Sequence, residues 1–439
     1  MGGRPARHIV VVGAGIAGLL TAAAAARHAE RVTVVERDSL AENGPRRGSP
    51  QDRQAHDLLA RGHQIVETLL PGTANRLVAA GAPLGDAGAQ ARWIINGRTL
   101  RRVHTGMNVA PATRPLRESL IREQVRALPG VTVLDGTSVV SLVSGPDRRV
   151  AGAVCQSRSQ ERVIRADLVV DASGRASRAG VWLRELGYAR PEEEKRRIDV
   201  NYVTCLYRAP EEAFDGDVSI NVMATPEVPR GSSCQRVEGG NTLLTVYGLL
   251  NDRPPTDPAG LLDFTKSLPA DDVYRVIEGS TPVSEATRYG FPANLRRRYE
   301  LMEDFPRGFL VLGDSVCSTN PRYGQGMTAA AMGVELLSEH LEDGTDPDPR
   351  GFFRDLATRV VDGVWNTTVV TDLSYPGVEG ERTDDVLWMH EFFRRVIDAA
   401  AEDPDVALEV IRACGLVVPF ESLAEPAVMA AVERHGGPV

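Results

Sequence analysis

Residues 8–37, HIVVVGAGIAGLLTAAAAARHAERVTVVER, constrain the fold of this chain more than any other stretch. A strand-like apolar run leads into GAGIAG, an alanine-rich helical run follows, and a second strand-like run ends at Glu36. A G-x-G-x-x-G turn in this context predicts a βαβ unit that binds a dinucleotide. The motif alone is weak, and a βαβ unit without a ligand is the alternative, but strand, helix and acid together favour binding.

Each residue of the turn has a physical role. Gly13 permits the tight turn, Gly15 lets the backbone approach a pyrophosphate, and Gly18 lets the helix pack closely on the strand. Ile16 and Ala17 lie where the helix begins, and its free N–H groups and positive dipole end attract phosphate. We therefore expect these residues to contact the cofactor.

The acid that ends the second strand selects among dinucleotides. Glu36 is placed to accept hydrogen bonds from an adenosine ribose and to repel a 2′-phosphate, so FAD or NAD is favoured over NADP. The polar loop that starts at Arg37 is expected to return to the cofactor, where Arg46 or Arg47 would neutralise a phosphate. A solvated loop whose arginines have no such role is the alternative.

Two further glycine-bearing loops follow apolar strand-like runs. DASGRASR begins at Asp171, and GDSVCSTNPRYGQGM spans residues 313–327. Ligands bind at the carboxyl edge of an open α/β sheet, where all three loops would meet. A plain NAD dehydrogenase would need only the first loop.

The third loop is the most informative of the three. Asp314 can accept a hydrogen bond from a hydroxyl group, and Pro321 stiffens the backbone. Gly324 and Gly326 bring bare N–H groups to the start of a helix at Met327, which is a favourable place for negative charge. A reduced flavin is anionic and needs such a partner. A simple βα connection is the alternative, and it leaves this density of Gly, Asp and Pro unexplained.

Together these motifs resemble those of the FAD-dependent aromatic-hydroxylase-type monooxygenases. The resemblance implies that FAD occupies the sheet edge, with its ADP half on the first loop and its ribityl chain near Asp314. It also implies further cofactor contacts at Arg114, Asp171, Gly174 and Arg175. In that group oxygen is transferred from a flavin hydroperoxide without a protein nucleophile or base, so no catalytic residue is predicted.

A narrower resemblance is to the squalene-epoxidase-related bacterial flavoproteins. It is carried by RRGSPQDRQAHDLLARG, LLPG, TRPLRESL, RRRYE and NPRYGQGM. That branch includes epoxidases of polyether polyketides, so the resemblance implies a lipophilic polyene-type substrate. The chain departs from the pattern at Gln54, where histidine is expected, and at Arg117, where an aliphatic residue is expected.

The predicted fold is α/β: a Rossmann-like FAD-binding fold with an inserted β-sheet substrate domain and a C-terminal helical region. We assign residues 1–190 and 290–345 to the FAD-binding domain, 191–289 to the substrate domain and 346–439 to the helical cap. Within these, we expect a helix over residues 53–70 and a charged surface turn at PEEEKRR, residues 191–197. His56 and His63 would then share one helical face, as structural neighbours of the cofactor.

Composition narrows the remaining possibilities. A net charge of −9 without a long basic stripe argues against nucleic acid as a partner. The five cysteines are widely spaced and predict neither a disulfide framework nor a metal site. No apolar run reaches the ~18 residues of a membrane span, and the first strand starts too early for a signal peptide, so we expect a cytoplasmic protein.

We therefore predict an FAD-dependent monooxygenase that epoxidises or hydroxylates a lipophilic secondary metabolite. NAD(P)H would bind transiently as the reductant, or act through a separate flavin reductase. A redox-silent cyclase that retains FAD and a flavin-dependent prenyl reductase are the alternatives. Candidate walls of the substrate pocket are the aromatic residues Tyr202, Tyr207, Tyr247, Phe291 and Trp365.

Overall fold

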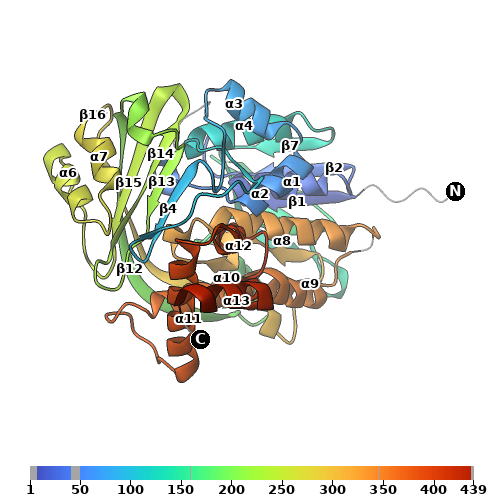
Figure 1. Ribbon diagram of the computed structural model, residues 1–439. Coiled ribbons are helices and arrows are strands. Elements are labelled where there is room, and N and C mark those ends of the chain that lie inside the picture. Colours follow the sequence, from blue (N-terminus) through green and yellow to red (C-terminus); the bar gives the residue numbers. More distant parts are fainter. Residues whose placement is uncertain (1–6, 41–49, 159, 345, 437–439) are drawn as a thin grey trace.

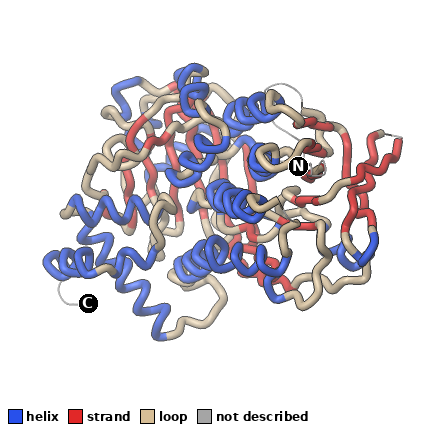
Figure 2. Tube along the Cα trace, turned by 90° about the vertical axis from the view of Figure 1, so that its right-hand side faces the viewer, coloured by secondary structure: helices blue, strands red, loops and turns tan. Residues whose placement is uncertain are grey.

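The computed structural model describes residues 7–40, 50–158, 160–344 and 346–436. Figure 1 shows three parts: a small sheet with helices on the right, a large sheet on the left, and C-terminal helices below both. The tube in Figure 2, turned by 90°, shows that the two groups of strands stand apart, with helices between and beside them.

The small sheet contains five parallel strands in the order β18-β11-β1-β2-β7. Its central strands are short apolar runs with both faces covered, as parallel sheets require, and β1 is buried along its whole length. In chain order the strands are β1 (His8–Val12), β2 (Arg31–Val35), β7 (Val131–Leu134), β11 (Leu168–Asp171) and β18 (Phe309–Val311).

Helices and a second, antiparallel sheet cover the small sheet. Helix α1 (Ile16–Ala25) packs against α8 (Gly326–Leu341), and α2 (Ala60–Leu69) packs against both of them. The remaining helices of this part are α3 (Thr73–Ala79), α4 (Arg114–Arg126) and α5 (Ala179–Glu185). The antiparallel strands are β8 (Thr137–Ser144), β9 (Val150–Ser157) and β10 (Gln160–Arg165).

The large sheet runs in the order β19-β17-β12-β15-β14-β13-β4-β5, with β16 paired to β12. Most of its pairs are antiparallel, but β4 lies parallel to β13 although the two are far apart in sequence. The strands are β4 (Ala91–Ile95), β5 (Arg98–Thr99), β12 (Glu192–Arg208), β13 (Ser219–Val222), β14 (Arg230–Val237), β15 (Asn241–Gly248), β16 (Thr281–Pro282), β17 (Thr287–Arg298) and β19 (Cys317–Ser318). Helices α6 (Pro258–Lys266) and α7 (Asp272–Glu278) cover its outer face.

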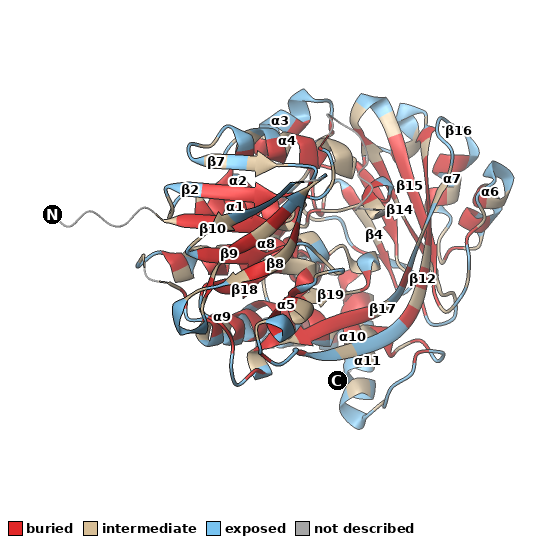
Figure 3. Cartoon of the chain, turned by 180° about the vertical axis from the view of Figure 1, so that it is seen from behind, coloured by how far each residue is buried: buried red, intermediate tan, exposed pale blue. Residues whose placement is uncertain are grey.

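The charged run at residues 191–197 is not a turn. It is the beginning of β12, which is largely exposed there (Figure 3). The acidic residues lie opposite the arginines of β17, so that Glu193 pairs with Arg297 and Glu194 with Arg298 across the strands. Opposite charges on facing strands stabilise the pairing, which explains why a segment with no apolar alternation forms a strand.

The helix expected over residues 53–70 is also shorter than predicted, since α2 begins only at Ala60. The N–H of Ala55 donates to the Thr245 hydroxyl at 3.1 Å, and the N–H of Leu59 donates to the Thr328 hydroxyl at 3.0 Å. These contacts with β15 and α8 hold residues 55–59 in a non-helical conformation. His56 therefore does not share a helical face with His63.

The C-terminal part is helical, as expected, and residues 373–383 connect two groups of helices. Its helices are α9 (Pro349–Leu356), a π-helical turn (Ala357–Val361), α10 (Asp362–Asp372), α11 (Asp384–Ala400), α12 (Pro404–Cys414) and α13 (Pro426–Gly436). Helices α11–α13 form a second hydrophobic core, to which Ile95 of β4 also belongs. The domain boundaries at residues 190, 290 and 345 stay a prediction, and the large sheet takes strands from both sides of the first two.

Within the described ranges, no helix combines the length and the apolar character needed to cross a bilayer. The same part of the chain contains no group of three His, Cys, Asp or Glu side chains arranged to hold a metal ion. All five cysteines are free thiols.

Candidate functional site

The three glycine-bearing loops meet at the carboxyl edge of the small sheet. A Cβ atom on Gly13 would lie 2.8 Å from the carbonyl oxygen of Ala172, so the first and second loops are in contact. The N–H of Gly174 donates to the Ser315 hydroxyl at 2.8 Å, which joins the second loop to the third. A Cβ atom on Gly313 would lie 3.1 Å from that of Ala17, so the third loop also contacts the first. We call this edge, residues 13–18, Glu36, 171–175 and 313–327, the cofactor edge.

The first loop has the backbone geometry that the motif predicts. Gly13 has a φ of +100°, which strains any residue with a side chain. A Cβ atom on Gly18 would lie 1.9 Å from the carbonyl oxygen of Gly13, so only glycine fits. Helix α1 begins at Ile16 without a side-chain cap or an acidic residue in its first turn, which leaves its N-terminus open toward the edge.

Glu36 stands at the end of β2, where the sequence places it. Its side chain is 5% exposed and accepts hydrogen bonds from the N–H of Ala14, at 2.7 Å, and from the N–H of Asp38, at 2.9 Å. The carboxylate is thus fixed beside the glycine turn. Arg37 follows directly and is exposed, whereas Arg46 and Arg47 lie outside the described residues.

The second loop is built around a fully buried carboxylate. Asp171 accepts from the N–H of Ser173 at 2.9 Å and from the Ser177 hydroxyl at 2.5 Å. Burial raises the pKa of Asp171, while these hydrogen bonds and Arg297 oppose the rise. Asp171 therefore shapes the loop from within, and Arg175 reaches the third loop, where its Nη1 donates to the Ser318 hydroxyl at 3.1 Å.

The third loop presents an open helix N-terminus. Gly324 has a φ of +66°, and α8 begins at Gly326 with no side-chain cap and no acid in its first turn, so Met327 lies in that turn. The Oε1 atom of Gln325, a residue only 5% exposed, has no hydrogen-bond partner in the described chain. The free N–H groups of this N-terminus would donate to an anionic or acceptor group of a ligand, and the Gln325 oxygen would accept from a donor group of the same ligand.

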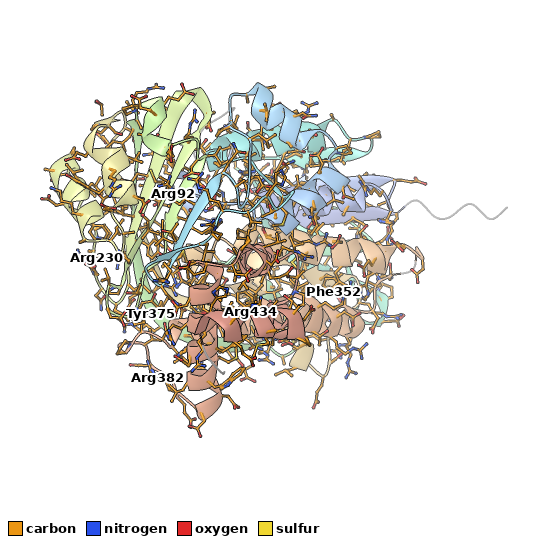
Figure 4. All side chains as sticks on the ribbon, in the orientation of Figure 1. Arg92, Arg230, Phe352, Tyr375, Arg382 and Arg434 are labelled. Carbon is orange, nitrogen blue, oxygen red and sulfur yellow. The ribbon has the colours of Figure 1, made fainter. Side chains whose placement is uncertain are left out.

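A buried polar cluster fixes the third loop to the C-terminal helices. Asp372, the last residue of α10, accepts from Tyr323 at 3.0 Å and from Asn320 at 3.1 Å, and its Oδ1 lies 3.6 Å from Nη2 of Arg322. Arg322 also donates to Tyr375, which Figure 4 shows where the large sheet meets these helices. This cluster could not be predicted from the sequence, because its members are far apart in the chain.

Opposite charges surround the start of α8. Burial raises the pKa of Asp314, and the positive charges of Arg114 and Arg175 oppose that rise. A Cβ atom on Gly326 would lie 3.7 Å from Oδ1 of Asp314, which places the carboxylate beside the helix N-terminus. Arg114, the first residue of α4, pairs with Asp52 at 3.1 Å.

These features fit FAD. The glycine cradle admits a backbone approach to pyrophosphate, and Glu36 is an acceptor placed for ribose. The start of α8 offers positive potential to a flavin. The predicted glycines and acids of the three loops are brought together, whereas Arg37 is exposed and Arg46 and Arg47 lie outside the described residues. Pro321 lies in a short 3₁₀ turn, in which the Asn320 side chain accepts from the N–H of Arg322 at 3.2 Å.

A cavity of about 50 Å³ opens beside the cofactor edge. A Cβ atom on Gly324 would lie 3.5 Å from Asp57 and from Leu59, so the cavity wall touches the third loop. The large sheet, α4 and the C-terminal helix α12 complete the enclosure. Its lining residues include Asp57, His63, Trp93, Arg117, Gln235 and Ile411.

The aromatic residues expected to line a substrate pocket do not line this cavity. Tyr202 of β12, Tyr247 of β15 and Phe291 of β17 are buried together in one hydrophobic core. Tyr207 and Trp365 belong to other cores. Trp93 is the aromatic residue that lines the cavity, with its indole N–H donating to the carbonyl of Ala87 at 2.9 Å. In the sequence, the only indication that Trp93 lines a cavity was the alternation of residues in its short hairpin strand.

His63, which lines the cavity, and His56 are both held in the neutral form. Burial and the positive charge of Arg117 lower the pKa of His63 to about 3, and burial and Arg114 lower the pKa of His56 to about 3. Arg117 itself has a pKa lowered by burial to about 10, so it remains charged at neutral pH. Both histidines are therefore much weaker bases than a free histidine side chain.

Comparison with known proteins agrees with this geometry. The family described as FAD dependent oxidoreductase matches residues 8–194. Protein Rv3254 of Mycobacterium tuberculosis is 32% identical over 445 residues, which cover 94% of this chain and 90% of the relative. The chain belongs to the FAD-dependent oxidoreductases. FAD is accordingly the cofactor of this family, and the residues at the cofactor edge fit it.

Solved structures confirm the α/β fold of this oxidoreductase. The flavin-dependent brominase Bmp2 aligns with a TM-score of 0.65 and 16% identity over 93% of each chain. The p-nitrophenol 4-monooxygenase PnpA from Pseudomonas putida aligns with a TM-score of 0.64 and 17% identity over 95% of this chain and 98% of that one. A flavoprotein/dehydrogenase from Cytophaga hutchinsonii aligns with a TM-score of 0.68 and 15% identity over 96% of each chain. At these identities the likeness concerns the fold.

Proposed function

We propose that this oxidoreductase is an FAD-dependent monooxygenase that oxygenates a small organic substrate held in the cavity beside the start of α8. The observation that carries the proposal is the contact between the cavity and the third loop, at Asp57, Leu59 and Gly324. A cavity that opens directly beside a flavin-binding edge is where a substrate for oxygen transfer would have to lie.

The residues of the chain would bind and orient FAD and the substrate, and would exclude water from them. The glycine turn and Glu36 would hold the ADP half, Arg114, Arg175 and Asp314 would surround the ribityl and flavin part, and Gly324–Gly326 would offer N–H groups. FAD supplies the redox and oxygen chemistry when bound. The low pKa values of His56 and His63 support a site in which the protein contributes no base.

The C-terminal helices would keep the cavity dry. Ile411, Cys414 and Gly415, from the end of α12, line its wall, and the N–H of Arg61 donates to the carbonyl of Gly415 at 3.1 Å. Apolar walls raise the strength of every polar contact inside and protect reactive species from water. The wall supports a lipophilic substrate, for which we propose epoxidation or hydroxylation of a polyketide-type secondary metabolite.

The electrons would come from NAD(P)H. A second dinucleotide fingerprint is absent from the sequence, so the nicotinamide would bind transiently or act through a separate flavin reductase. A redox-silent cyclase and a prenyl reductase use the same cofactor edge and the same cavity. These activities differ in whether the flavin is reduced and in whether oxygen is consumed.

The decisive experiment follows the flavin spectrum of the purified protein without oxygen. NADPH and then NADH are added, and photoreduction is used if neither bleaches the flavin. Air is then admitted with and without bromide, and oxygen uptake and hydrogen peroxide are measured. Rapid reoxidation that consumes oxygen supports the monooxygenase.

Other outcomes overturn the proposal. Photoreduced protein that reoxidises no faster than free FAD points to the cyclase or the reductase. Bromination of an added phenol would assign the protein to the halogenases. A protein that neither retains FAD nor takes it up would contradict a flavin-based function altogether.

A further inference from the structure

Arg117 is a buried cation without a matching anion. It lies on α4, its residue is 2% exposed, and its Nη2 donates to the carbonyl oxygen of Ala110 at 2.8 Å. Its Nε and Nη1 atoms have no hydrogen-bond partner in the described chain, and no ion pair includes it. A buried guanidinium group lowers stability unless it is paired. The two nitrogen atoms without a partner therefore require an explanation.

Arg117 lines the cavity, and its two unpartnered nitrogen atoms are buried in the cavity wall. The same wall contains the neutral His63, the amide of Gln235 and the apolar faces of Leu58, Trp93 and Ile411. The negative charges of Asp57 and Glu238 favour the charged form of Arg117 without a hydrogen bond or ion pair to it. Glu238 is engaged elsewhere, because it accepts from the N–H and hydroxyl of Thr113.

We propose that Arg117 binds a carboxylate of the substrate, so that this oxidoreductase acts on an amphiphilic organic acid rather than on a neutral hydrocarbon. Charge-assisted hydrogen bonds from Nε and Nη1 would satisfy the guanidinium. The apolar wall would hold the rest of the molecule.

A single negative charge fits this site better than a double one. Asp57 also lines the cavity and accepts from Gln235 at 2.6 Å, so it opposes a dianion such as a phosphate monoester. The cavity has room for roughly four water molecules, which suits the end of a molecule that carries one carboxylate. This inference refines the proposed function and rests on it.

The test compares an acid with its neutral amide. Isothermal titration of the purified holoprotein with benzoate and with benzamide measures head-group selection directly, and FAD content is measured separately by absorbance. We expect wild-type protein to bind benzoate at least tenfold more tightly than benzamide. Arg117→Gln should lose that preference, and Arg117→Lys should retain part of it. Arg126→Gln, an exposed arginine on the same helix, should behave as wild type.

A second variant keeps the test decisive if Arg117→Gln does not fold. Asp57→Asn retains an acceptor for Gln235 but removes the facing negative charge, so benzoate should bind several-fold more tightly and benzamide unchanged. Equal affinity for benzoate and benzamide in wild type, or bromide binding more tightly than benzoate, would overturn the assignment. Because heats of binding do not depend on redox activity, loss of the monooxygenase proposal and loss of this one remain distinguishable.

Discussion

The cofactor edge and the cavity beside it are built in different ways. The cofactor edge is made mainly of backbone, with glycines at fixed spacings, helix N-termini and one acid at a strand end. The cavity is made of side chains from the large sheet, α2, α4 and α12. A backbone site leaves a short motif in the sequence, whereas a side-chain cavity does not. The contrast predicts that substitutions at the edge abolish the cofactor, and that substitutions at the cavity change what is bound.

The largest effect is expected from Gly18→Ala. The new methyl group would lie 1.9 Å from the carbonyl oxygen of Gly13, so the strand–helix turn must move. We expect loss of bound FAD and a decrease of about 3 kcal/mol in the free energy of unfolding, measured by absorbance and urea denaturation. Gly363→Ala, on an exposed part of α10 with open space around it, is the control and should stabilise the protein slightly. Retention of FAD by Gly18→Ala would contradict a backbone-built site.

Asp372→Ala tests whether the C-terminal helices support the cofactor edge. It leaves the buried Arg322 without its carboxylate, which costs about 3–5 kcal/mol in comparable pairs. The third loop should also lose order, so FAD affinity should fall together with stability. Hydrogen exchange of residues 320–326 measures the loop directly. Unchanged exchange there would separate the cluster from the cofactor edge.

Glu36→Ala removes the carboxylate, and with it the acceptor of the Ala14 N–H, but leaves every glycine of the turn in the sequence. Hydrogen bonds to a charged group contribute about 1.5–3 kcal/mol, so FAD should bind about 10–100 times more weakly. Glu36→Gln keeps an acceptor for the N–H of Ala14 and should lose less. Fluorescence titration of the apoprotein with FAD gives both values. Equal losses in the two variants would mean that the charge, and not hydrogen bonding, governs binding.

A smaller, pH-dependent effect on the free energy of unfolding is expected from His63, which lines the cavity. His63 has a pKa of about 3 in the folded protein against 6.5 for the free side chain, so the unfolded chain binds more protons between these values. Its contribution to stability is complete above pH 6.5 and is lost as the pH falls toward 3. Each such histidine adds a slope of about 1.4 kcal/mol per pH unit.

The measurement is urea denaturation of wild type and His63→Leu from pH 7.5 to 4.5. The variant should lose stability less steeply with acid than wild type. His104→Leu, whose side chain is 80% exposed, serves as the control and should keep the wild-type slope. Parallel curves for wild type and His63→Leu would show that the histidine is not buried in its neutral form.

The same contrast explains what the sequence could predict. The strands and loops of the cofactor edge were predicted because their local pattern and their tertiary role coincide. The start of β12 was missed because its acidic run is paired by arginines of β17, far along the chain. Arg117 was visible as a departure from the family pattern, but its unpartnered guanidinium could be found only in three dimensions.

The parallel pairing of β4 with β13 also governs how the protein is made. Ala91 lies opposite Ser219, so the β4–β5 hairpin leaves the ribosome long before the strand it rests on has been synthesised. Pairings so distant in sequence form slowly, because the intervening chain must be closed into a loop first. The nascent chain therefore carries an unpaired strand edge while β18 and α8 of the nucleotide-binding part are also still to be synthesised. Completion of the large sheet, rather than of the glycine motif, is the step most exposed to aggregation.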